Sequence, residues 1–176
     1  MRLLLAGITV ALVASATAAS ELPVAPRMLA QAAEAVQRQA CADVLGSLRL
    51  AAQEPTPSGA RAAYLLGHCL AAAGRYDEAR SVFLDASRRH TTLSAYARLG
   101  AARAAFRAGD ISAAADLGRP PAGVPTAAAA RLLLTRAEAL LRAGDAREAA
   151  AIARMLVGGK HSDGVLADGW WLLGRA

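Results

Sequence analysis

The chain has 176 residues, which is enough for one domain once a targeting segment has been removed. Hydrophobic residues make up 55% of the sequence but aromatic residues only 4%, which favours alanine-rich, closely packed helices and excludes a core of large side chains. The net charge is +6, but the arginines are spread singly along the chain without interleaved aromatic residues, which argues against nucleic-acid binding.

Residues 1–19 have the features of a secretory signal peptide. Arg2 provides a short positive start, residues 3–13 form an apolar run too short to cross a bilayer comfortably, and small residues with A-x-A spacing follow. Cleavage is expected after Ala18, and a membrane anchor is the weaker alternative because the run is short and ends in a cleavable stretch. The sequence therefore predicts secretion across the inner membrane, a periplasmic location and no membrane span in the mature chain.

Residues 20–57 are expected to form a leader followed by a degenerate first helical hairpin. An apolar helical pattern begins at Met28, and a second helix is expected to contain Cys41 and Leu48. Prolines at 55 and 57 end this hairpin. Ser58 is the expected N-cap of the next helix, and Thr126 has the same expected role further along the chain.

The remaining residues, 58–176, carry a repeat with a period of 35. Glycines stand at positions 74, 109 and 144, alanines follow each of them at 79, 114 and 149, and small residues at 67, 102 and 137 keep the same step. Glycine ends a helix readily because it adopts positive φ without a Cβ clash, and Asp110 and Asp145 are placed to cap the helices that follow. The periodicity predicts antiparallel helical hairpins at 58–91, 92–125 and 126–161, and a truncated repeat at 162–176.

The first of these hairpins also carries a known sequence pattern. Its Leu66-Gly67 dipeptide, followed by Ala79 and Phe83, matches the L-G and A-x₃-F positions of tetratricopeptide repeats. The later hairpins match less well, since Gly118 and Arg136 replace an aromatic residue and a leucine. The chain thus resembles tetratricopeptide-repeat (TPR) proteins. This resemblance implies an all-α, TPR-type α-solenoid of stacked antiparallel hairpins that acts as a scaffold for protein–protein interaction in the cell envelope.

A second resemblance concerns the C-terminal part of the chain. Residues 137–149 and 170–176 are similar to the N-terminal, non-catalytic solenoid of soluble lytic murein transglycosylases. This alternative implies a peptidoglycan enzyme whose catalytic domain lies outside the chain, and no catalytic residue can be carried over. Trp170, Leu173 and Gly174 fit the start of a further repeat that has no second helix, so we expect the N-terminal part of a longer protein. A genuine terminus used for dimerisation is the other interpretation.

No pattern typical of catalysis or metal binding occurs. The histidines at 68, 90 and 161 are scattered without metal-ligand spacing, and no G-x-S-x-G nucleophile elbow is present. The glycine-rich segment at 158–164 contains Lys160 but lacks the spacing of a phosphate-binding loop. The sequence therefore predicts no enzymatic activity, no metal and no cofactor for these residues.

Two cysteines, Cys41 and Cys69, are expected on neighbouring helices of an exported chain, where oxidation is permitted. We predict that they face each other. A disulfide bond and two buried small apolar residues are both compatible with that placement.

A partner-binding surface is expected on the first helix of each hairpin, because these helices line the inner face of a solenoid. Helical periodicity places on this face a strip of basic and aromatic residues: Arg61, Tyr64, His68, Tyr96, Arg103, Phe106, Arg107, Arg131, Glu138 and Arg142. Such a strip suits carboxylates or an extended acidic peptide, with peptidoglycan as a further candidate partner and a solvated helix face as the alternative. The prediction requires Arg103 and Arg107 to lie on the concave wall.

Overall fold

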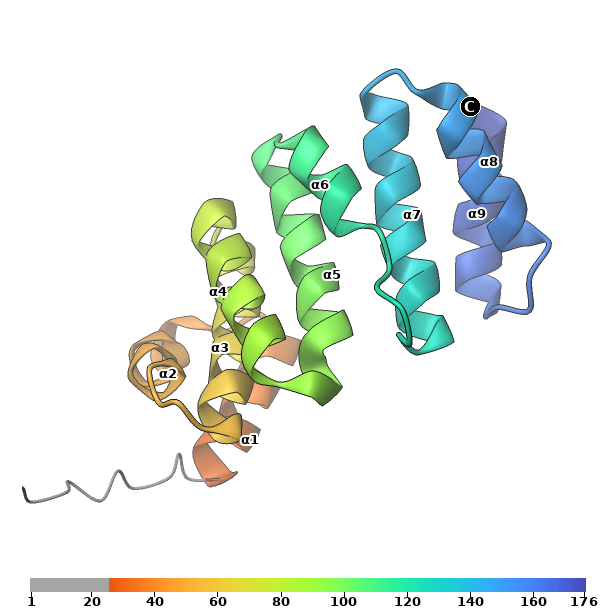
Figure 1. Ribbon diagram of the computed structural model, residues 1–176. Helices are drawn as coiled ribbons and strands as arrows, with labels where there is room; N and C mark the ends of the chain where they lie inside the picture. Colours follow the sequence, from red (N-terminus) through yellow and green to blue (C-terminus); the bar gives the residue numbers. More distant parts are fainter. Residues whose placement is uncertain (1–25) are drawn as a thin grey trace, which may run out of the picture.

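The computed structural model describes residues 26–176, and within that range every regular element is a helix (Figure 1). The elements are α1 (Pro26–Gln37), the 3-10 helix η1 (Ala42–Val44), α2 (Leu45–Ala52), α3 (Pro57–Ala72), α4 (Tyr76–Arg89), α5 (Thr91–Ala108), α6 (Ile111–Leu117), α7 (Thr126–Arg142), α8 (Ala146–Val157) and α9 (Asp163–Arg175). The all-α prediction is confirmed for these residues.

The predicted signal peptide, 1–19, lies outside the described range. None of the helices between residues 26 and 176 combines the length and the apolar character needed to cross a membrane.

From α3 onward, successive helices pack against each other as antiparallel neighbours, and α3, α5, α7 and α9 lie side by side (Figure 1). In this row α3 contacts α5, α5 contacts α7, and α7 contacts α9. No comparable contact joins α4 to α6 or α6 to α8 in the described part of the chain. The first helices of the hairpins are therefore closer together than the second helices.

Glycines end the first helix of each hairpin, as the period predicts. Gly74, Gly109 and Gly144 have φ of 75°, 85° and 87°, in the left-handed region that side chains with a Cβ rarely adopt. The two predicted aspartate caps are also confirmed. The Asp110 carboxylate accepts a hydrogen bond from the Ala113 amide at 3.1 Å, and Asp145 accepts one from the Glu148 amide at 3.0 Å.

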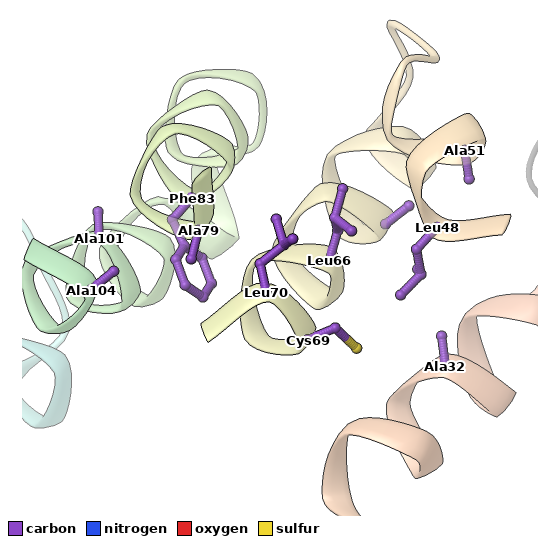
Figure 2. Packing of buried hydrophobic residues seen from close by; sticks show 11 residues of the cluster. Ala32, Leu48, Ala51, Leu66, Cys69, Leu70, Ala79, Phe83, Ala101 and Ala104 are labelled. Carbon is purple, nitrogen blue, oxygen red and sulfur yellow. The ribbon is translucent and has the colours of Figure 1, made fainter. Parts of the chain in front are cut away.

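The small residues predicted at the helix crossings are buried, and one aromatic side chain packs between two of the helices. Phe83, on α4, is 1% exposed and lies in the buried cluster between α3 and α5 (Figure 2). It fills the space beside Gly67 on α3 and Gly100 on α5. A Cβ atom on either glycine would lie 2.7 Å from the Phe83 ring. The two glycines therefore provide the surface on which this ring packs.

The hairpin of α5 and α6 has arginine contacts in place of that aromatic packing. A Cβ on Gly118 would lie 2.8 Å from the Cβ of Arg136, so α7 approaches the end of α6 closely. Arg136 is buried and forms an ion pair with Glu148. Arg98 donates hydrogen bonds to the carbonyl oxygens of Leu117 at 2.9 Å and Asp116 at 3.1 Å, which caps the C-terminus of α6. These contacts account for the departures from the repeat pattern at 118 and 136.

The predicted position of Cys41 on a helix is wrong. Gln39 has φ of 58°, so the chain reverses after α1, and Cys41 lies in the connection before η1. Cys41 and Cys69 are joined by a disulfide bond with their Cα atoms 5.4 Å apart. Because Cys69 is buried on α3, the bond ties the connection after α1 to the core of the first repeat.

The two hydroxyl caps expected at 58 and 126 are also wrong. Thr56 is the N-cap of α3, where its Oγ1 accepts a hydrogen bond from the Gly59 amide at 3.0 Å. Pro57 occupies the first helical position, which suits a residue without an N–H and displaces Ser58 into the helix. In the hairpin of α7 and α8 the N-cap is Pro125, which makes no side-chain hydrogen bond to the helix, and Thr126 is already helical.

Replacing Thr56 by alanine should lower the free energy of unfolding by about 1 kcal/mol, because one amide of the first turn of α3 loses its acceptor. Ser58→Ala is the matched control and should change the free energy of unfolding by less than about 0.5 kcal/mol. Urea unfolding followed by circular dichroism measures both values. Equal losses for the two variants would contradict the assignment of Thr56 as the cap.

Candidate functional site

An open groove of about 840 Å³ lies on the row of first helices. Its walls come from α5, α7 and α9, and the first residue of α4 closes one side. The residues that line it are Tyr76, Arg103, Phe106, Arg107, Thr135, Glu138, Leu141, Arg142, Trp171, Leu172 and Arg175. We call this hollow the arginine groove.

Each wall helix contributes a pair of residues four positions apart, which places both on the same helical face. The pairs are Arg103 and Arg107 on α5, Glu138 and Arg142 on α7, and Trp171 and Arg175 on α9. All of these residues belong to the C-terminal halves of their helices. The groove is therefore confined to one end of the helix row.

Four arginines line the groove, and Glu138 is the single carboxylate among the lining residues. None of these arginines forms an ion pair within residues 26–176. Arginines elsewhere are often neutralised, as Arg80 is by Asp77 at 3.2 Å and Arg89 is by Asp85 at 2.7 Å. Guanidinium groups that outnumber the carboxylates of a hollow focus a positive potential there.

Two of the groove arginines rest on aromatic rings. The Cζ atom of Arg142 lies 4.6 Å from the ring centroid of Phe106, and that of Arg175 lies 4.9 Å from Trp171. Such a contact restrains the guanidinium group, while its N–H groups, which lie in the guanidinium plane, stay free to bind a ligand. Trp171 remains 53% exposed, so it also offers an apolar surface to whatever enters the groove.

Burial raises the pKa of the half-buried Glu138 carboxyl group above its ordinary value. The Asp168 carboxylate acts in the same direction, while Arg103 and, more weakly, Arg107 and Arg142 oppose the shift in pKa. Desolvation, together with Asp168, therefore raises the pKa of Glu138 by more than the arginines lower it.

A smaller hollow of about 350 Å³ adjoins the groove and shares Tyr76, Arg103 and Arg107 with it. His68 lines this hollow, and its ring packs edge-on against Tyr64 at 4.7 Å and against Phe83 at 5.0 Å between centroids. Burial, reinforced by the positive charge of Arg103, lowers the pKa of His68. Burial raises the pKa of the Tyr64 hydroxyl. Together the two hollows form one surface from α3 to α9.

The structure gathers some of the residues predicted for partner binding and leaves others apart. Those in the arginine groove are Arg103, Phe106, Arg107, Glu138 and Arg142, and His68 lines the adjoining hollow with Tyr64 packed on it. Arg61, Tyr96 and Arg131 are exposed and line neither hollow. They lie in the N-terminal halves of their helices, whereas both hollows open at the opposite end.

Sequence reasoning missed Tyr76, Thr135, Leu172, Trp171 and Arg175 as lining residues. A signal for the last two was present. If the W-x₂-L-G segment at 170–174 is aligned with residues 63–67, Trp171 and Arg175 take the positions of Tyr64 and His68. No comparable signal marks Tyr76, which reaches the groove only because α4 begins beside the end of α5.

No group of three or more histidine, cysteine, aspartate or glutamate side chains between residues 26 and 176 is arranged to hold a metal ion. The arrangement suits recognition of an anion through guanidinium and aromatic groups. Comparison with protein-family models gives no match, and comparison with curated proteins and with solved structures gives none either.

Proposed function

We propose that the chain is an exported scaffold for protein–protein interaction, a TPR-type α-solenoid whose arginine groove receives the partner. The 35-residue repetition of Gly74, Gly109 and Gly144 and their left-handed conformation support the repeat. The closer packing of α3, α5, α7 and α9 supports curvature, because the row with the tighter contacts lies on the inside of a bend.

The observation that carries the proposal is the gathering of unpaired arginines and aromatic rings in one groove. Arginine and aromatic residues are enriched where proteins bind each other, since they combine a large contact area with directed hydrogen bonds. Like charges gathered in one place lower the stability of a folded chain, so a hollow lined by several arginines favours a binding role over a structural one.

The disulfide bond between Cys41 and Cys69 supports the proposed location. Such bonds persist in oxidising compartments and are reduced in most cytosols. Together with the signal-peptide features of residues 1–19, this bond favours the periplasm as the place where the groove meets its partner.

Capture experiments with matched charge reversals test the proposal. The tagged full-length protein, an Arg103→Glu/Arg107→Glu variant and an Arg61→Glu/Arg131→Glu control are used to capture binding partners from a cell-envelope extract. The control reverses two exposed, unpaired arginines that line neither hollow. We expect the groove variant to lose its partner by about tenfold or more, because two charge-assisted contacts become repulsive, and the control to retain it.

Equal capture by all three proteins would contradict a role for the groove. Co-sedimentation of the same proteins with purified peptidoglycan separates the two partner classes. Sedimentation of the wild type that is lost in the groove variant, without any captured protein, would replace the protein-scaffold proposal with a cell-wall one.

A further inference from the structure

We infer that the arginine groove binds an extended acidic peptide, and that Glu138 competes with this peptide at neutral pH and ceases to compete when it is protonated. This inference rests on the proposed function and assigns its ligand class and its regulation. It draws on the charges in the groove, on the spacing of the helices and on the surroundings of Glu138.

Charge complementarity selects the ligand. Four guanidinium groups face the groove without an ion-pair partner in the described residues, and each presents paired N–H donors that match a carboxylate. The exposed face of Trp171 adds apolar contact area beside them. Separated carboxylates on a flexible backbone can meet these groups one by one.

The dimensions of the groove suit a short extended segment. Packed helices lie about 8–10 Å apart, so two steps from α5 to α9 span roughly 20 Å. An extended chain advances about 3.3 Å per residue and covers that distance in about six residues. The groove is thus long enough to bind several side chains of one strand-like peptide.

Glu138 lies among the groups that would bind the peptide. Arg103 and Arg107 face it from α5, Arg142 from its own helix and Asp168 from α9, and Tyr76 of α4 lines the same groove. Glu138 forms no ion pair within residues 26–176, so the guanidinium N–H groups stay available. Its negative charge nevertheless lowers the positive potential that an acidic peptide meets.

Acidification should strengthen binding through Glu138. Its pKa is raised, so as the pH falls through the folded-state value, Glu138 loses its charge while peptide carboxylates, with pKa values of about 3.9 to 4.3, remain ionised. His68, beside Arg103, gains a positive charge on acidification and acts in the same direction. A substitution at each position separates the two contributions.

The ligand class is tested by selecting random octapeptides displayed on phage against the full-length protein. We expect enrichment of peptides rich in Asp and Glu, and enrichment of basic or neutral peptides would overturn the ligand assignment. A selected peptide, labelled with a dye whose emission does not depend on pH, is then titrated at a series of pH values from about 7.5 downward, because the raised pKa of Glu138 makes it lose its charge before the peptide carboxylates do.

Glu138→Gln is expected to bind the labelled peptide about 3- to 10-fold more tightly than the wild type at about pH 7.5 and to lose most of the pH dependence. Glu34→Gln on α1 removes one exposed negative charge far from the groove and should behave as the wild type does. Circular dichroism verifies that both variants are folded.

Unchanged or weaker binding by Glu138→Gln, or a pH dependence that persists in it and disappears in His68→Asn, would overturn the role of Glu138. Neither result touches the proposed function, which is tested separately by the capture and co-sedimentation experiments with Arg103→Glu/Arg107→Glu.

Discussion

Replacing Phe83 by alanine is expected to lower the free energy of unfolding by about 3–5 kcal/mol, the range typical of a fully buried phenylalanine. Phe83 is 1% exposed and packs against Gly67 and Gly100, neither of which has a side chain to collapse into the cavity. The loss should therefore fall in the upper part of that range. Urea unfolding monitored by circular dichroism gives the value, and Phe83→Leu is the control with a smaller expected loss.

A double-mutant cycle with Gly100→Ala tests the same contact from the other side. In the wild type the new Cβ would lie 2.7 Å from the Phe83 ring, so Gly100→Ala should destabilise the protein. In the Phe83→Ala background the obstacle is absent, and alanine should stabilise α5 by up to about 1 kcal/mol through its helix propensity. The same sign of effect in both backgrounds would show that the ring does not pack on Gly100.

Removing the disulfide bond by Cys41→Ala/Cys69→Ala should lower the free energy of unfolding by about 3–4 kcal/mol, since the cross-link closes a loop with a sequence separation of 28. The loss of the cross-link should mainly affect α1 and η1, which the bond ties to α3. Chemical denaturation measures the global loss, and amide hydrogen exchange locates it.

Dithiothreitol provides the control for this experiment. Reduced wild type should approach the stability of the double-alanine variant, and the variant itself should not respond to the reductant. A stability of the wild type that is the same with and without dithiothreitol would mean that the bond contributes little, or that it is not formed in solution.

Two sets of arginines in the described residues differ in their surroundings. Arg80, Arg89 and Arg136 are held by carboxylates, and Arg89 also donates to the carbonyl oxygen of Glu54 at 2.8 Å. Arg103 and Arg107 face a hollow instead. Charge reversal in the first group should unfold the protein locally, whereas reversal in the groove should change binding with little effect on stability. The proposals above depend on this separation.

The sequence by itself determined the helices and the turns between them. Gly74, Gly109 and Gly144 could be identified because a left-handed residue is a local requirement of the backbone, and Asp110 and Asp145 because a cap reaches only a few residues along the chain. The choice of Thr56 over Ser58 shows the limit of this local reasoning, since Pro57 shifted the start of α3 by two residues.

Only the tertiary structure decided which arginines are available for a ligand. Arg80 is neutralised by Asp110, 30 positions away in the sequence, and Arg136 by Glu148 on the next helix. Arg103 also lies on a helix but forms no ion pair in the described residues. Trp171 and Arg175 join the groove because α9 packs against α7. Pairing and exposure depend on distances between helices, and helical periodicity describes only one helix at a time.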